Sequence, residues 1–201
     1  LDLGADKEIV PGSSSCCTNP ALGLRAIRLC LQEPELFLPQ LRAILRASAY
    51  GPLRILIPML TTAEEIPQVI GLINRAKDEL TRERKRFDPD VMIGGMIEVP
   101  AAALCADIFA RQLDFLSIGT NDLMQYSLAT DRIDETVNHL FDPLNIGLLR
   151  LIDTVLKAGR HTGTPVAMCG EMAGDPALTP LLLALGLKEF SVPPVSYTHL
   201  R

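Results

Sequence analysis

Residues 91–126 read "VMIGGMIEVPAAALCADIFARQLDFLSIGTNDLMQY", and this stretch decides the fold. An apolar run over residues 91–99 ends at Pro100, a residue that favours the first turn of a helix. A second apolar run over residues 115–119 stops abruptly at three polar residues. Short, almost continuous apolar strands joined by a helix are typical of a parallel sheet that is covered by helices on both faces. The stretch therefore predicts a β–α–β unit.

The same alternation continues on both sides of this unit. Amphipathic helical patterns follow Thr62, which forms a capping-box pattern with Glu65, and Asn145, another favourable capping residue. Further strand candidates occupy residues 1–4, 53–60, 165–169 and 189–192. Such an alternation closes either as an open doubly wound sheet or as a (β/α)8 barrel. The sequence contains no glycine-rich dinucleotide fingerprint and no P-loop, which favours the barrel.

The length of the chain limits how much of a barrel it can form. A complete (β/α)8 barrel takes about 250 residues, whereas this chain has 201 residues. Only six strand candidates are present. We therefore expect an α/β chain whose residues 1–195 form an incomplete TIM barrel with about six of the eight strands.

The composition is that of a water-soluble globular protein, with 48% hydrophobic and 21% charged residues. No apolar run approaches the roughly 18 residues of a membrane helix, so we expect no membrane partner. The formal net charge of −5 and the absence of a basic run also argue against nucleic acid as a partner. The five cysteines are odd in number and show no CxxC spacing, which favours a reducing, cytoplasmic setting over a disulfide framework.

Two carboxylates follow neighbouring predicted strands. Glu98 lies at the end of the strand over residues 91–99, and Asp122 follows the strand over residues 115–119. Adjacent strands lie roughly 5 Å apart, so the two carboxylates can converge at one edge of the sheet. Taken singly, each is better explained as a helix-dipole partner or a turn residue. As a pair they predict a Mg²⁺ site, because Mg²⁺ binds one or two carboxylates together with water and phosphate oxygens.

Other candidates for chemistry are less specific by themselves. Arg25 and Arg132 are suited to bind phosphate or carboxylate groups, although a single arginine is usually a solvated surface residue. Cys169 ends the predicted strand over residues 165–169, where a thiol can donate a proton. The alternative for Cys169 is a small buried residue of the core.

Six motifs give the chain a specific resemblance to a known family. They are "LDLGADK" (1–7), "NPALGLRAIR" (19–28), "LRAILRASAYGPLRILIPML" (41–60), "MIEVPAAA" (96–103), "DFLSIGTNDLMQYSLATDR" (114–132) and "MCGEMAGD" (168–175). In this order they resemble the phosphoenolpyruvate (PEP)-binding barrel of Enzyme I, the PEP–protein phosphotransferase of the bacterial sugar phosphotransferase system. The resemblance extends over residues 1–192.

The resemblance implies roles for seven residues. Those that match the Mg²⁺ ligands of the family are Glu98 and Asp122. Those that match its substrate-binding residues are Lys7, Arg25, Asn121 and Arg132. Cys169 matches the acid that protonates the enolpyruvate carbon. In the family the phosphoryl group of PEP moves to a histidine on a separate N-terminal domain and then to the carrier HPr, with release of pyruvate.

The resemblance also sets expectations for the whole protein. The N-terminal histidine domain is absent from this sequence, so we expect a transferase fragment that is inactive alone and that would form a homodimer in the full-length protein. The last six residues, "SYTHLR" (196–201), do not resemble the family, and we expect them to be a non-native or misread tail.

Three alternatives remain open from the sequence. The sister enzymes pyruvate phosphate dikinase and PEP synthase share "GTND"-like and "CG" motifs but differ around "QYSLATDR" and "GLRAIR". A non-catalytic dimerisation or binding fragment would keep the site without turnover. A metal-dependent aldolase barrel would use a similar acidic pair, but it leaves Cys169 and the two arginines unexplained.

Overall fold

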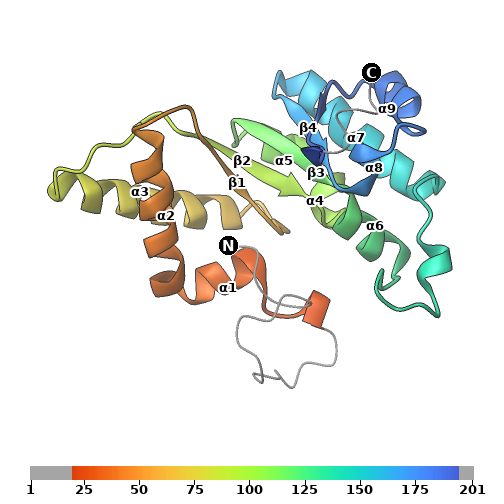
Figure 1. Ribbon diagram of the computed structural model, residues 1–201, viewed down its shortest axis with the longest axis horizontal. Coiled ribbons are helices and arrows are strands. Elements are labelled where there is room, and N and C mark those ends of the chain that lie inside the picture. The colour runs from red at the N-terminus through yellow and green to blue at the C-terminus, as the bar shows by residue number, and fades with distance from the viewer. Residues whose placement is uncertain (1–19, 195–201) are drawn as a thin grey trace. The chain divides into compact units, whose positions relative to one another are not determined.

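The computed structural model describes residues 20–194 and divides the chain into two compact units (Figure 1). The first unit comprises Leu1–Met59 and Glu64–Met92, and the second comprises Leu60–Ala63 and Ile93–Arg201. The strand predicted at residues 1–4, Lys7 and the tail predicted at residues 196–201 lie outside the described residues.

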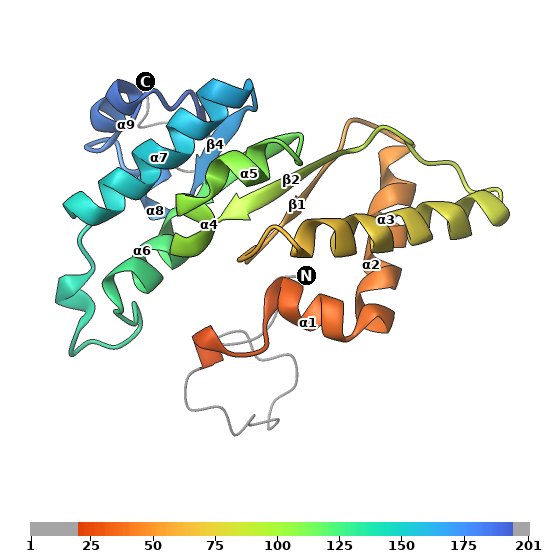
Figure 2. The same ribbon diagram turned by 180° about the vertical axis from the view of Figure 1, so that it is seen from behind.

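The first unit is built mainly from two long helices that pack against each other (Figure 2). Its described elements are the 3-10 helix η1 (Pro20–Leu22), α1 (Ala26–Gln32), α2 (Pro34–Ser48), β1 (Arg54–Ile57) and α3 (Glu65–Arg82). The apolar residues of α2 and α3 recur with helical spacing, so each helix buries one face. These buried residues are Phe37, Leu38, Leu41 and Leu45 of α2 and Ile66, Val69, Ile73, Ala76 and Leu80 of α3.

An ion-pair network links α2 and α3 beside this apolar contact. Arg42 of α2 donates to Glu79 at 3.0 Å and to Glu83 at 2.8 Å. The helix α3 begins later than the sequence predicted. Its N-cap is Glu64, whose side chain makes no capping hydrogen bond, and Thr62 lies in the preceding turn segment.

The second unit contains four parallel strands that pair in chain order. They are β2 (Met92–Ile97), β3 (Phe115–Gly119), β4 (Val166–Cys169) and β5 (Glu189–Phe190). Ile97 pairs with Ile118, Gly119 with Cys169 and Met168 with Phe190. All five residues of β3 are buried, as expected for a strand that has neighbours on both sides and helices over its faces.

In the described residues, helices follow β2, β3 and β4 of the second unit. They are α4 (Pro100–Leu104), α5 (Ala106–Ala110), α6 (Thr120–Leu128), the 3-10 helix η2 (Asn138–Leu140), α7 (Ile146–Thr162), α8 (Glu171–Gly174) and α9 (Thr179–Leu185). Both α4 and α5 pack against α7. The side chain of Asn145 caps α7 by accepting hydrogen bonds from the backbone N–H groups of Gly147 at 2.9 Å and Leu148 at 3.4 Å. The predicted cap of this helix is confirmed.

The α/β class with parallel pairing is confirmed, and five of the six predicted strands lie at the predicted places in the described residues. Only β3 has the predicted length; β1, β2, β4 and β5 are shorter than predicted, and β2 ends at Ile97, one residue before Glu98. Within residues 20–194, no helix has both the length and the apolar character needed to cross a bilayer.

Candidate functional site

The carboxyl ends of β2 and β3 bring the predicted acidic pair to one edge of the sheet. Glu98 directly follows β2, and Asp122 lies in the first turn of α6, which begins where β3 ends. The pairing of Ile97 with Ile118 places Glu98 beside Gly119. A Cβ atom at Gly119 would lie 2.8 Å from Glu98 Oε2 and 2.9 Å from Glu98 Cβ. Glycine at position 119 therefore makes the space that the Glu98 side chain occupies.

Both carboxylates are buried, although charged groups are costly to remove from water. Glu98 is 4% exposed and Asp122 is 8% exposed. The described residues contain no group of three or more His, Cys, Asp and Glu side chains arranged to hold a metal ion. A Mg²⁺ ion needs only one or two protein carboxylates when water and substrate phosphate fill its other positions. Two buried carboxylates at neighbouring strand ends fit this requirement.

Cys169 lies at the end of the next strand along the sheet. It pairs with Gly119, and its Sγ lies 3.9 Å from the donating Ser117 Oγ and 3.6 Å from the carbonyl oxygen of Ile118. Burial raises the pKa of the Cys169 thiol; the hydrogen bond from Ser117 opposes this shift, and the charges of Glu98 and Asp122 add to it. The thiol therefore keeps its proton, and both carboxylates lie within electrostatic reach of it.

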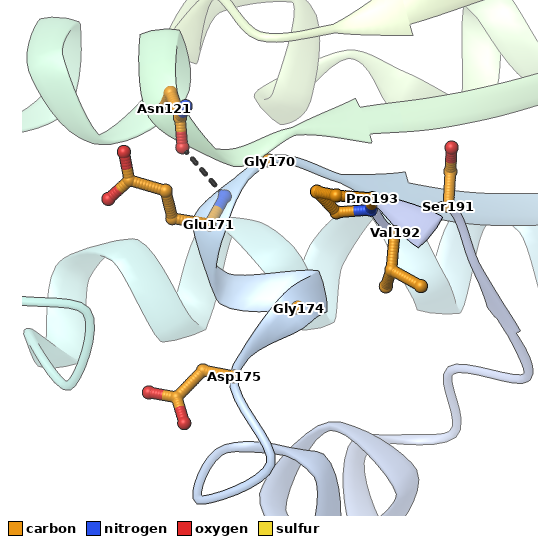
Figure 3. Close-up of a pocket in the computed structure, with 8 residues that line it drawn as sticks. All are labelled: Asn121, Gly170, Glu171, Gly174, Asp175, Ser191, Val192 and Pro193. Atoms are coloured by element: carbon orange, nitrogen blue, oxygen red, sulfur yellow. Dashed lines mark hydrogen bonds between the residues drawn. The ribbon is translucent and has the colours of Figure 1, made fainter. Parts of the chain in front are cut away.

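Hydrogen bonds join the segments that follow β3 and β4. Thr120 Oγ1 donates to the carbonyl oxygen of Cys169 at 2.9 Å, and Asn121 Oδ1 accepts from the backbone N–H of Glu171 at 3.0 Å (Figure 3). Gly170 has φ +90°, and a Cβ atom there would meet Thr120 Oγ1 and lie 2.8 Å from Asn121 Oδ1. Glycine is required at position 170 both by its backbone conformation and by this close approach.

A pocket of 720 Å³ opens beside Asn121 (Figure 3). It lies at the carboxyl ends of β3, β4 and β5 and is lined by Asn121, Gly170, Glu171, Gly174, Asp175, Ser191, Val192 and Pro193. No binding or catalytic role was predicted for Glu171 or Asp175 from the sequence. Both belong to the quoted motif "MCGEMAGD", and the position of Glu171 two residues after a predicted strand was the signal that could have identified it.

The segment that carries Arg132 is fixed to the same helix as Asn121 and Asp122. The helix α6 ends at Leu128, and its C-cap residue, Ala129, adopts a left-handed conformation with φ +52°. The backbone N–H of Arg132 then donates to the side chain of Gln125 at 3.2 Å, and Gln125 is itself buried. The predicted anion-binding arginine therefore follows α6 in an anchored segment.

The remaining two predicted residues do not belong to the described part of the second unit. Arg25 belongs to the first unit, where it precedes α1 and is only 2% exposed. Such burial excludes the alternative of a solvated surface arginine. Lys7 lies outside the described residues. The structure thus brings together Glu98, Asn121, Asp122 and Cys169.

Sequence comparison identifies relatives over the whole chain. The family described as "PEP-utilising enzyme, PEP-binding domain" matches residues 1–201. A protein named phosphoenolpyruvate-protein phosphotransferase from Cupriavidus necator is 52% identical over 203 residues, covering 100% of this chain and 35% of that protein. The Bacillus subtilis protein of the same name is 48% identical over 192 residues, covering 96% and 34%. The chain thus spans about a third of the length of these relatives, and the predicted resemblance is confirmed.

Solved structures with much lower sequence identity share the fold. A HpcH/HpaI aldolase/citrate lyase family protein from Burkholderia cenocepacia superposes with a TM-score of 0.57 at 19% identity, covering 84% of this chain and 66% of that one. A citrate lyase from Burkholderia xenovorans gives a TM-score of 0.58 at 18% identity, covering 81% and 52%. These similarities concern the fold alone, and they agree with the α/β class.

Proposed function

This chain belongs to the family of PEP-binding domains of PEP-utilising enzymes, and we propose that it is the PEP- and Mg²⁺-binding part of a PEP–protein phosphotransferase. The whole enzyme would transfer the phosphoryl group of PEP to a histidine of an N-terminal domain and then to HPr, releasing pyruvate. One observation carries the proposal. Glu98, Asp122 and the protonated thiol of Cys169 meet at the ends of three adjacent parallel strands.

Glu98 and Asp122 would hold the Mg²⁺ ion. When bound, the ion would neutralise part of the negative charge of the PEP phosphate and position it. The carboxylates would serve this role because both are buried and neither must move into the site from solvent. Gly119 keeps the Glu98 carboxylate in place by leaving no side chain between the two strands.

The substrate anion would be bound by Asn121 together with Arg25, Arg132 and Lys7. The chain carries a formal net charge of −5, so attraction of PEP has to come from such local groups. Asn121 accepts a hydrogen bond through Oδ1 from the backbone of Glu171. Its Nδ2 group is consequently the donor that it can offer to a substrate oxygen.

Cys169 would complete the release of pyruvate. Cleavage of the P–O bond of PEP leaves the enolate of pyruvate, and its terminal carbon takes a proton from the Cys169 thiol to form the methyl group. Water would then reprotonate the thiolate. Burial keeps the thiol protonated until a strong base such as the enolate forms beside it.

The experiment that tests this proposal is calorimetric titration of the chain with PEP, with and without Mg²⁺. We expect Mg²⁺ to strengthen binding of PEP, and we expect Glu98→Gln or Asp122→Asn to remove the strengthening. Asp107→Asn, on the exposed side of α5, is the matched control and should behave as the unmodified chain. If both site variants retain Mg²⁺-dependent binding, the assignment of the metal ligands is wrong.

The choice between a phosphotransferase and its sister enzymes rests on the names of the relatives, which are phosphotransferases at 47–52% identity. A full-length protein that contains this chain should phosphorylate HPr from PEP, without pyrophosphate or AMP. The chain alone would bind PEP without transferring its phosphoryl group. Such an enzyme would work in the cytoplasm and, as a whole protein, as a homodimer.

A further inference from the structure

A second hollow, of 450 Å³, lies in the first unit at the end of α2 and just after α3. Its lining residues are Ala43, Arg46, Ala47, Ala49, Tyr50, Arg84, Lys85 and Arg86. Half of these residues are cationic and none is acidic. In a chain whose formal net charge is −5, such a concentration of positive charge identifies a local site for an anion.

Within the described part of the chain, no acidic side chain forms an ion pair with the four cationic side chains of this hollow. Other arginines of the same unit are paired: Arg42 with Glu79 and Glu83, and Arg75 with Glu35 and Glu79. Within residues 20–194, the side chains of the hollow's cations, Arg46, Arg84, Lys85 and Arg86, form no ion pair and no hydrogen bond. Their charge is consequently available to a ligand.

Glu83 is the nearby carboxylate that could have neutralised the hollow. Both of its oxygens accept from Arg42 Nη2 at 2.8 Å. This hydrogen bond is the main reason why the pKa of the Glu83 carboxyl is lowered, with Lys85 and Arg46 adding weaker attraction. Because Glu83 is held by Arg42 on α2, it leaves the basic residues that follow α3 unpaired.

The backbone at Arg84 gives a second, independent observation. Arg84 adopts φ +55° and donates from its N–H to the carbonyl oxygen of Thr81 at 3.0 Å, while Lys85 N–H donates to Leu80 at 2.9 Å. This is the Schellman arrangement, in which glycine is the usual residue at the left-handed position. Glycine would adopt this left-handed conformation with less strain than arginine. The arginine at this position therefore indicates a function for its side chain.

Stabilisation of the helix dipoles explains only one of the four cations, Arg46, which lies in the last turn of α2. Cations interact favourably with a helix C-terminus within its last turn. Arg46 of α2 and Arg82 of α3 already occupy these last turns. Arg84, Lys85 and Arg86 lie beyond the end of α3, where this effect has decayed.

We propose that this hollow binds a small molecule with two or more linked phosphate groups. Arginine forks bind phosphate oxygens in pairs, and a diphosphate carries enough negative charge to engage several of the four cations. The volume of 450 Å³ is in the usual range of small-ligand sites. Tyr50, which is 86% exposed in the lining, offers an aromatic face for a nucleoside base. Inorganic pyrophosphate and a nucleoside diphosphate are the two sources of this chemistry.

Calorimetric titrations of the full chain with pyrophosphate and with ADP, both without divalent cations, test the proposal. We expect both to bind, and we expect binding to weaken as KCl is added. Arg84→Gly and Arg86→Gln should each lower the affinity at least five-fold. Arg84→Gly should also preserve or raise the melting temperature, because glycine suits the left-handed conformation. This second measurement separates lost ligand contact from unfolding.

Matched controls distinguish this site from the proposed PEP site. Arg150→Gln removes an exposed arginine from α7 of the second unit and should leave both affinities unchanged. Glu98→Gln should do the same, whereas it should remove the Mg²⁺ effect on PEP binding. Failure of the phosphate titrations would therefore leave the proposed PEP site intact, and failure of the PEP titrations would leave this one intact.

Tyr50→Ala identifies the source of the ligand. If it weakens binding of ADP but not of pyrophosphate, the site takes a nucleoside diphosphate; if it weakens neither, the linked phosphates alone are recognised. Either result supports the site. Absence of binding at millimolar concentrations, or affinities that Arg84→Gly and Arg86→Gln leave unchanged, would overturn the proposal. Binding of a single-stranded oligonucleotide in preference to both small phosphates would also overturn it.

Discussion

The substitution Gly119→Ala tests the close approach on which the proposed metal site depends. Gly119 ends β3, and its backbone has φ −90°, a value that alanine adopts without strain. Any effect of the substitution must consequently come from the added methyl group. That group would lie 2.8 Å from Glu98 Oε2, 2.9 Å from Glu98 Cβ and 2.9 Å from Met96 Sδ.

The size of the effect follows from these distances. Ordinary contact begins at 3.4 Å, so the Glu98 carboxylate has to retreat by roughly 0.6 Å. Overpacking of this kind in a buried region costs about 1–3 kcal/mol, which corresponds to a melting temperature lower by about 2–12 °C. Displacements of this order at a binding constellation also reduce function, and we expect Mg²⁺-dependent PEP binding to weaken about ten-fold.

Differential scanning calorimetry and calorimetric titration with PEP and Mg²⁺ measure the two effects. Gly71→Ala is the matched control, because Gly71 lies within α3 and a Cβ atom there meets nothing within 4 Å. The control should stabilise the chain by roughly 0.5–1 kcal/mol, since alanine favours a helix interior. If Gly119→Ala leaves both the melting temperature and PEP binding unchanged, the close approach of Gly119 to Glu98 does not determine the position of the Glu98 carboxylate.

Two further predictions concern local interactions in the second unit. Asn145→Ala removes the cap of α7 and should destabilise the chain by about 0.5–2 kcal/mol in urea unfolding, whereas Asn145→Asp should retain the stability; an equal loss in both variants would contradict the capping role. The pKa of Cys169 is raised by burial, so iodoacetamide should modify Cys169 more slowly than the exposed Cys105 at pH 8–9. The raised pKa also implies that this thiol's contribution to stability is complete below the unfolded-state pKa of about 8.5 and is lost as pH rises above it. Peptide mass spectrometry measures the two rates of modification. Faster modification of Cys169 than of Cys105 would refute the raised pKa of Cys169.

The parts of the structure that the sequence predicted well depend on local patterns. The continuous apolar run of residues 115–119 predicted a strand buried on both faces, and all five residues of β3 are buried. Asn145 predicted a helix start because its side chain bonds to N–H groups two and three residues away. The pattern at Thr62 was as favourable, but the chain turns there and α3 begins at Glu65. Helix starts are among the least certain predictions because neighbouring turns compete with the cap.

The site depended partly on local patterns and partly on strand pairing. Glu98 and Asp122 could be predicted to converge because each follows a strand in consecutive β–α units. The motif could have identified Glu171 as a candidate, but the pocket that it lines together with Asn121 depends on which strands pair. The hydrogen bond from Glu171 N–H to Asn121 Oδ1 joins residues 50 positions apart in the sequence, and no local sequence pattern predicts it.

Sequence alone determined the class of fold and the residue types of the site, because strand and helix periodicity and the chemical character of a side chain are local properties. Tertiary structure decided which side chains meet and which are removed from water. The pairing of Gly119 with Cys169 sets the thiol near the two carboxylates, and burial then raises its pKa. Likewise, Arg42 of α2 pairs with Glu83, the residue that follows α3, and within the described residues this leaves the basic residues around Arg84 unpaired. Burial and charge pairing are properties of groups brought together from distant positions, and folding alone creates them.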